Sequence, residues 1–423
     1  MRSKTKRAED LRARFADGSG EGATRYVPGT HRSRSLEETW ALLRPTAEAI
    51  GITRVANVTG LDRIGIPVVM VCRPRNRSLS VYQGKGLTLA AARVSGAMES
   101  LERFSAEYLR LPDFVGTPAD AASRAAVVPH DLWPLPVNGE RRTDAPIGWM
   151  RGFDLIAGED VLVPHPVVHL DKRLPGAPGC EGFDNTSTGL AAGNIYAEAI
   201  VHGLCEVIER DALTLWRLLP EFRRMLSRIA LSSIEGPTLN PLLAAIEGAG
   251  LACAIFDLRS ATGVPAFVCR IAEFRGDFYR PADMVDGAGC HPCREIALAR
   301  AIAEAAQIRA TAIAGSRNDF FRRHYSVPSE LEVALVRSSV EAPEAGRTFG
   351  SCASFEHGSA AEDLAFLLDR LRPLARHVVA VDLARPELGW PVVRVLVPEL
   401  EDGEEMARYA PRERARRAYL GRL

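Results

Sequence analysis

The sequence lacks the features that place a protein in or at a membrane. Its 423 residues contain no uninterrupted apolar run near the roughly 20 residues that span a bilayer. The N-terminal segment, MRSKTKRAEDLRARF, has no apolar core of the kind found in secretory signals. Lysine plus arginine number 53, as do aspartate plus glutamate, so no overall charge recruits nucleic acid or an anionic membrane. We expect a soluble, cytoplasmic protein without a nucleic-acid or membrane partner.

Standard catalytic motifs are also missing. The tripeptide Gly84-Lys85-Gly86 does not have the GxxxxGK[ST] spacing of a P-loop and is, alone, more typical of a turn. The histidines stand outside HExxH and nucleophile-elbow motifs. The eight cysteines are scattered, several in apolar runs, which is typical of reduced, buried thiols. Cys290 and Cys293 have no second pair at zinc-finger spacing, so a buried loop is favoured over structural zinc.

What the sequence does contain is an unusual acidic helix. The stretch Asn185–Trp216 predicts one helix that carries Asn194, Glu198, Glu206 and Glu209. At roughly 100° per residue, these side chains fall within about 120° of arc. A soluble helix seldom gathers three carboxylates on a face flanked by Ala, Ile, Val, Leu and Cys. We therefore expect a cationic group opposite them.

A second copy of this acidic pattern lies earlier in the chain. Segments 96–103 and 203–210 both follow GxxExφER, where φ is Leu or Ile, and a looser version at 300–309 keeps Glu304 but has Gln307 as its second member. One isolated copy would favour a solvated helix face with intrahelical ion pairs. Repetition in otherwise apolar or Ala-rich helices favours a functional site and an internally duplicated fold.

The residue types of these helices suit a nucleotide site with Mg²⁺. Carboxylates that face each other across a cleft raise each other's pKa unless a divalent cation or arginines compensate. Mg²⁺ needs few protein carboxylates because phosphates complete its coordination, and basic side chains supply donors to phosphate oxygens. The predicted metal ligands are Glu99, Glu102, Glu206 and Glu209. The predicted phosphate donors are Lys85, Arg103, Arg210, Arg300 and Arg309.

Helices and strands alternate along the chain, which predicts an α/β (α+β) protein with mixed sheets. Residues 1 to about 30 are basic and polar and are expected to form a loosely held tail, while 31–423 form one domain whose motifs lie within 84–320. Ser35 and Glu38 have the spacing of a capping box at a helix start. Other predicted elements are strands at 54–58, 66–72, 149–155, 160–164, 253–257 and 266–272, helices at 88–108, 294–314 and 361–371, and a loop at 287–293.

Three stretches in this order resemble the YcaO family: GKGLTLAAARVSGAMESLERFSAE, NTSTGLAAGNIYAEAIVHGLCEVIERDALTLW and HPCREIALARAIAEAAQIRATAIAGSRNDF. The resemblance implies two similar, pseudo-symmetric halves with an ATP site in which acidic helices, without a P-loop, hold Mg²⁺ and the nucleotide phosphates. The family's nucleotide-binding positions fall on Ser95, Glu99, Asn194, Glu198, Arg210, Arg300 and Glu304, with Lys85, Arg32 or Arg34 as N-terminal candidates. Some members have a serine where this chain has Ala191, which puts one phosphate or ribose contact in doubt.

The resemblance also implies a reaction: ATP-dependent phosphorylation of a peptide backbone amide oxygen. Azoline-forming members commonly end in a proline-rich tail, whereas this chain ends in ARRAYLGRL and its opening is similar to members that act beside a TfuA protein. We therefore expect thioamide formation on a peptide or protein substrate with a TfuA-like partner. An azoline-forming cyclodehydratase and a non-catalytic nucleotide-binding scaffold remain alternatives, and a homodimer is left open.

Overall fold

The computed structural model describes residues 25–27, 30–136, 139–140, 144–173, 182–273, 284–319, 321, 325, 329–342, 347–403, 406 and 409–420. Most of the expected N-terminal tail, residues 1–24 and 28–29, lies outside these ranges. Within the tail, strand β1 (Arg25–Val27) pairs with β2 (Thr30–Arg32), so ordered structure begins before residue 31.

In the described part of the chain the strands form four sheets, and every pairing between the named strands is antiparallel, so the mixed sheets expected from the sequence are not found among them. Besides the β1–β2 pair, these are a three-stranded sheet of β3 (Arg54–Asn57), β4 (Val68–Cys72) and β5 (Val81–Lys85), and a four-stranded sheet of β10 (Arg228–Ile229), β11 (Ala252–Asp257), β12 (Ala266–Ala272) and β13 (Met284–Cys290). The six-stranded sheet comprises β6 (Phe114–Gly116), β7 (Ile147–Asp154), β8 (Glu159–Pro164), β9 (Leu190–Ala192), β14 (Val379–Asp382) and β15 (Val392–Leu396).

The α-helices alternate with these strands, as the sequence predicts. They are α2 (Leu36–Ala49), α3 (Leu89–Glu107), α4 (Pro118–Ala122), α5 (Tyr196–Arg217), α6 (Glu221–Met225), α7 (Leu239–Gly248), α8 (Arg294–Ala314), α9 (Glu330–Glu341), α10 (Ala360–Leu371) and α11 (Glu413–Tyr419). The predicted capping box is confirmed, because the Ser35 side chain accepts from the Glu38 amide and the Glu38 carboxylate accepts from the Ser35 amide. The predicted hairpin of β7 and β8 is confirmed as well.

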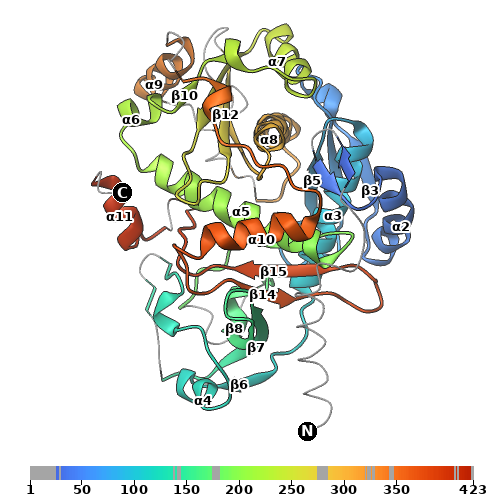
Figure 1. The fold of residues 1–423 in the computed structure, drawn as a ribbon. Helices are drawn as coiled ribbons and strands as arrows, with labels where there is room; N and C mark the ends of the chain where they lie inside the picture. The colour runs from blue at the N-terminus through green and yellow to red at the C-terminus, as the bar shows by residue number, and fades with distance from the viewer. Residues whose placement is uncertain are drawn as a thin grey trace.

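Helix α5 runs through the middle of the molecule (Figure 1). It packs on β9 and β15 of the six-stranded sheet, on β13 of the four-stranded sheet and on α10. Helix α3 covers β4 and β5, and α8 covers β12 and β13 while also touching β5. The three helices that carry the repeated motif therefore converge between the sheets.

Two glycine-bearing strands allow α3 and α8 to lie unusually close to their sheets. A Cβ at Gly84 of β5 would lie 2.0 Å from the Ala92 carbonyl oxygen of α3, and one at Gly287 of β13 would lie 2.1 Å from the Ala305 amide nitrogen of α8. The predicted loop at 287–293 is therefore wrong for its first half, since residues 287–290 belong to β13. The glycines that suggested a loop serve close helix packing instead.

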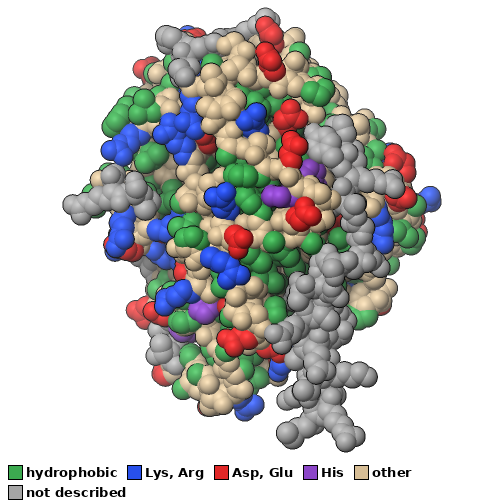
Figure 2. All heavy atoms as spheres, in the orientation of Figure 1, with side chains coloured by type: hydrophobic (Ala, Val, Ile, Leu, Met, Phe, Trp, Pro, Cys, Tyr) green, Lys and Arg blue, Asp and Glu red, His purple; other side chains and the backbone are tan. Residues whose placement is uncertain are grey.

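On the face shown in Figure 2, both acidic and basic side chains are exposed. Among the described residues, no helix is both long and apolar enough to cross a bilayer.

Candidate functional site

Helices α3 and α5 bring three carboxylates together. Glu99 and Glu102 lie on α3, Glu206 lies on α5, and all three are half-buried. Burial raises the pKa of Glu102 well above its usual range; the hydrogen bond from the Ala192 amide (2.8 Å) opposes this, and the nearby charges of Glu99 and Glu206 raise the pKa further. The charges of Glu99 and Glu206 thus disfavour the ionised form of Glu102, which is the electrostatic environment that a bound cation would relieve.

The backbone before α5 helps to orient this group. The Gly189 amide donates to Oε2 of Glu206 at 2.9 Å, and the Ala192 amide donates to Glu102. Strand β9 and the turn before it therefore contact carboxylates from both helices. One oxygen of Glu102 and one of Glu206 accept these backbone hydrogen bonds, and Oε1 of Glu206 lies 3.9 Å from the Arg210 guanidinium.

A second pair of carboxylates, Glu209 and Glu304, lies among basic side chains. Lys85 Nζ is 2.6 Å from Oε2 of Glu304, and the Arg210 guanidinium is 3.9 Å from both Glu206 and Glu209. Burial raises the pKa of Glu209, and the Glu304 charge adds to the effect. Burial opposes ionisation of Glu304 too, but Lys85 and Arg210 outweigh it and lower its pKa to about 2. Glu304 is thus the ionised member, already neutralised by protein cations.

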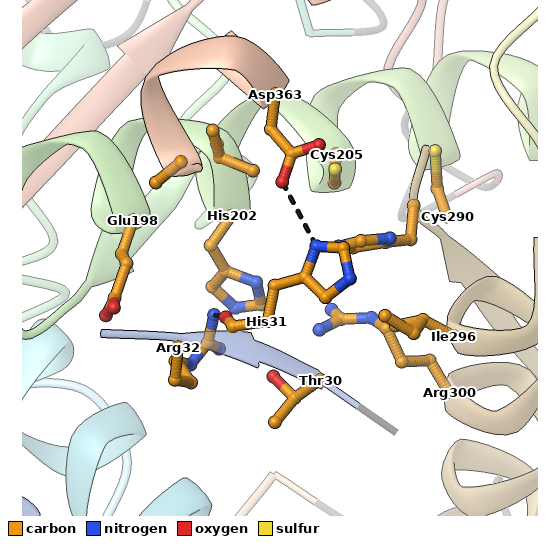
Figure 3. Close-up of a pocket in the computed structure, with 13 residues that line it drawn as sticks. Thr30, His31, Arg32, Glu198, His202, Cys205, Cys290, Ile296, Arg300 and Asp363 are labelled. Carbon is orange, nitrogen blue, oxygen red and sulfur yellow. Dashed lines mark hydrogen bonds and ion pairs between the residues drawn. The ribbon is translucent and has the colours of Figure 1, made fainter. Parts of the chain in front are cut away.

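A pocket adjoins these residues at the start of α5 (Figure 3). Glu198 forms one wall, and Arg300 of α8 points into it near Arg32 of β2. Burial lowers the pKa of Arg32; the Glu198 charge opposes this, and that of Arg300 adds to it. The Nε of Arg300 is buried without a hydrogen-bond partner. Two guanidiniums facing one recess, one with an unpaired donor, suit an anionic ligand.

Asn194 is not on the helix where the sequence placed it. Helix α5 begins at Tyr196, so Asn194 precedes it and instead holds Glu198. The Asn194 amide and side chain donate to Oε2 of Glu198 at 3.0 and 3.1 Å, and the Ser33 amide donates to the other oxygen. Thr39 donates to Asn194 Oδ1 at 3.1 Å. The N-terminal segment is thereby fixed to the pocket wall.

Two other residues predicted for the site, Ser95 and Arg309, lie in different places. Ser95 lies half-buried on α3, one turn before Glu99. Arg309 does not join the site: its guanidinium bonds Asp62 at 2.9 Å and Glu273 at 3.2 Å. The prediction that Arg309 serves phosphate was wrong, because the α8 face that it occupies turns towards these two acids.

A histidine cluster that the sequence analysis did not predict lies beside the pocket. Asp363 of α10 accepts from His31 at 3.3 Å and from His357 at 2.9 Å, and the His291 ring lies edge-on to His31. His31, His291 and Asp363 have ligand atoms within 4.8 Å of one another. However, the Cys293 amide donates to Nδ1 of His291, and both Asp363 oxygens accept hydrogen bonds, so the contacts describe a hydrogen-bonded network rather than a metal centre. No local pattern could predict it, since His31 and Asp363 are 332 residues apart.

These donors fit a magnesium-bound polyphosphate. Hard carboxylate oxygens that are short of positive charge suit Mg²⁺, and the adjacent lysine and arginines suit phosphate. The candidate Mg²⁺ ligands among the described residues are Glu102, the two carboxylates whose charges act on it, Glu99 and Glu206, and the neighbouring Glu209.

Comparison with known proteins agrees with this chemistry. Residues 83–401 match the family described as YcaO cyclodehydratase, ATP- and Mg²⁺-binding. The chain is 37% identical over 383 residues, 88% of each chain, to a protein of Rhizobium leguminosarum bv. trifolii described as an uncharacterized protein in the tfuA 3′ region. It is also 37% identical over 361 residues to an uncharacterized protein of Methanothermobacter thermautotrophicus, covering 83% of this chain and 90% of the relative.

Solved structures also show similarity to a YcaO protein and to a heterocyclase. The YcaO from Methanopyrus kandleri, bound with AMPPCP and Mg²⁺, has a TM-score of 0.72 at 26% identity and covers 92% of this chain and 98% of its own. A heterocyclase in complex with substrate and cofactor has a TM-score of 0.75, covering 92% of this chain and 56% of its own; at 19% identity this shows the fold alone. The expected fold class is confirmed, and the chain belongs to the YcaO family.

Proposed function

We propose that this chain uses Mg-ATP to phosphorylate a backbone amide oxygen of a peptide or protein, and that the product is a thioamide formed with a TfuA-type partner. The observation that carries the proposal is the convergence of Glu99, Glu102 and Glu206 from two helices. A divalent cation bound between them would relieve their mutual repulsion.

Each group of residues has a distinct part in this proposal. Glu99, Glu102 and Glu206 hold Mg²⁺, with Glu209 as the fourth ligand. Lys85, Arg210, Arg300 and Glu304 form the basic and ion-paired surroundings of the phosphates. Asn194 and Glu198, which are joined by two hydrogen bonds, would form part of the nucleotide-binding wall together with Ser95 of α3. ATP and Mg²⁺ supply the phosphoryl group and part of the charge neutralisation.

The chemistry explains why such a site needs no obvious acid or base. An amide is a poor electrophile whose oxygen leaves badly, and phosphorylation of that oxygen makes it a good leaving group. Phosphoryl transfer depends chiefly on positioning and charge stabilisation. The residues described above supply both. The nucleophile then determines the product: sulfide gives a thioamide, whereas a neighbouring Cys, Ser or Thr side chain gives an azoline.

Thioamide formation is favoured because the Rhizobium relative is described by its position next to tfuA. Azoline formation is the second candidate, since the family description and the heterocyclase likeness both concern cyclodehydration. A non-catalytic scaffold would have little use for a group of carboxylates in which Glu99 and Glu206 raise the pKa of Glu102.

Product analysis separates the candidates. The chain, a TfuA-type protein and peptides encoded beside its gene would be incubated with Mg-ATP and sulfide, and ADP release and peptide mass would be followed. Replacement of oxygen by sulfur, which increases the mass, supports thioamide formation. Loss of one water identifies a cyclodehydratase, and Mg-ATP binding without ADP release identifies a scaffold.

Glu206→Gln is expected to lower ADP release at least about 100-fold. An amide is a poor ligand for Mg²⁺, so the variant should bind more weakly the ion that Glu102 also ligates. Glu247→Gln, the same change on the exposed side of α7, is the matched control. Both variants should melt at similar temperatures. ADP release by Glu206→Gln at the rate of the control would remove the metal assignment.

A further inference from the structure

Arg103 is a basic residue beside the proposed magnesium ligands that, unlike Lys85 and Arg210, forms no ion pair with a described carboxylate. It follows Glu102 on α3 and is half-buried. Its Nη2 donates to the Ser187 hydroxyl at 2.9 Å, across to the turn that precedes β9. Its charge also lowers the pKa of Glu102, which places it beside the proposed magnesium ligands.

Two other cations of the site, Lys85 and Arg210, have direct ionic partners. Lys85 lies 2.6 Å from Glu304, and Arg210 lies 3.9 Å from Glu206 and Glu209. Within the described part of the chain, Arg103 has no carboxylate within 4.0 Å, and its hydrogen-bond partner is the neutral hydroxyl of Ser187. A guanidinium has five N–H donors, so most of its donors remain for a ligand.

The position of Ser187 fixes Arg103 relative to the site. Two residues later, the Gly189 amide donates to Glu206, so one short segment contacts both the arginine and a proposed metal ligand. If Glu102 and Glu206 hold a metal-bound phosphate, Arg103, whose direction is set by Ser187, would be placed to donate to its oxygens. A planar fork of donors is well suited to phosphoryl oxygens.

We propose that Arg103 is a catalytic residue that stabilises the phosphoryl group during transfer, and that Ser187 positions it. This rests on the proposed function. In the step, the bond between the acceptor oxygen and the γ-phosphorus forms as the bond from that phosphorus to the ADP oxygen breaks. ADP leaves with that electron pair, and Arg103 neutralises charge without giving up a proton. Such an arginine stabilises the transition state more than bound ATP.

The test separates transfer from nucleotide binding, with water as the acceptor so that no peptide is needed. ADP release from Mg-ATP and the Kd of Mg-AMPPCP would be measured for Arg103→Gln, Arg103→Lys and Ser187→Ala. Arg93→Gln is the matched control, because Arg93 lies on the same helix and its guanidinium stacks on the Trp40 ring.

We expect Arg103→Gln to lower kcat about 100- to 1,000-fold while the Kd of Mg-AMPPCP changes less than about threefold. Arg103→Lys should recover part of the loss because it restores the charge, and Ser187→Ala should lower kcat about tenfold. A kcat for Arg103→Gln equal to that of Arg93→Gln would overturn the proposal, as would an equal loss of Mg-AMPPCP affinity, which would make Arg103 a ground-state ligand. Wild-type protein that binds no Mg-AMPPCP would instead refute the proposed function, and this inference with it.

Discussion

At the scale of single residues, the carboxylates of the site divide into two kinds. Glu304 is ionised and paired with Lys85, whereas Glu102 is held in an environment that favours its protonated form. The first kind is complete without a ligand. In the second kind, ionisation of the carboxyl group is unfavourable in the metal-free protein. A bound cation would remove this electrostatic cost, so cation binding would stabilise the folded protein.

Glu102→Gln tests this division through the stability of the metal-free protein. A carboxyl whose pKa is raised in the folded state makes the fold less stable as pH rises from its usual value of 4.5 towards the raised pKa. The glutamine variant should therefore be more stable than wild type near neutral pH by about 1 kcal/mol. It should also lose most of the stabilisation by Mg-AMPPCP. Denaturant unfolding at pH 5 and 8 measures both effects, and a variant less stable than wild type at pH 8 would contradict the account.

At the scale of elements, two strand and helix pairs set the distance between the motif-bearing helices and their sheets. Gly84 on β5 and Gly287 on β13 let helix backbones approach where any side chain would collide. Because Glu304 and Arg300 lie on α8, the closeness of α8 to β13 also sets their position relative to α5. The Ala288 amide of β13 contacts Glu304 at 3.3 Å, which makes the coupling direct.

Gly287→Ala is expected to push α8 from its sheet. Its Cβ would meet backbone atoms at 2.1 and 2.4 Å, which cannot rotate away as a side chain could. We expect a loss of about 3 kcal/mol in unfolding free energy, together with weaker Mg-AMPPCP binding. Gly248→Ala, where a Cβ meets nothing within 4 Å, is the control. Unfolding and calorimetry that gave equal results for the two variants would show that the close packing is not required.

At the scale of the whole molecule, segments from both ends of the chain close the pocket. The contact of His31 with Asp363 ties β2 to α10, and α10 packs on α5. The Ser33 amide reaches Glu198 in the same region. The pocket in Figure 3 therefore depends on the complete fold rather than on the motif-bearing helices alone.

Asp363→Asn should weaken this closure without unfolding the protein. An amide cannot accept from both histidines as a carboxylate does, so His31 and the adjacent Arg32 lose a constraint. We expect the Kd of Mg-AMPPCP to rise about tenfold, equivalent to about 1.4 kcal/mol. Asp369→Asn, on the exposed side of α10, is the control. Unchanged affinity measured by calorimetry would mean that the link does not shape the pocket.

Local sequence patterns were sufficient to predict many of the helices and strands. The capping box at Ser35, the hairpin of β7 and β8 and the extents of α3 and α8 follow from interactions a few residues apart. The family was evident from three ordered stretches, and the family comparison confirms it. Internal duplication, thioamide formation and the roles of individual site residues remain predictions.

The sequence by itself determined which helices carry carboxylates, because their spacing along a helix is a local property. Only the tertiary structure decided which acids share a charge environment, that Glu304 pairs with Lys85, that Arg309 turns to Asp62, and that residues 287–290 form a strand. The physical reason is that charge pairing and backbone approach depend on groups far apart in the chain. Those distances are set by how the sheets and helices pack, which no local pattern specifies.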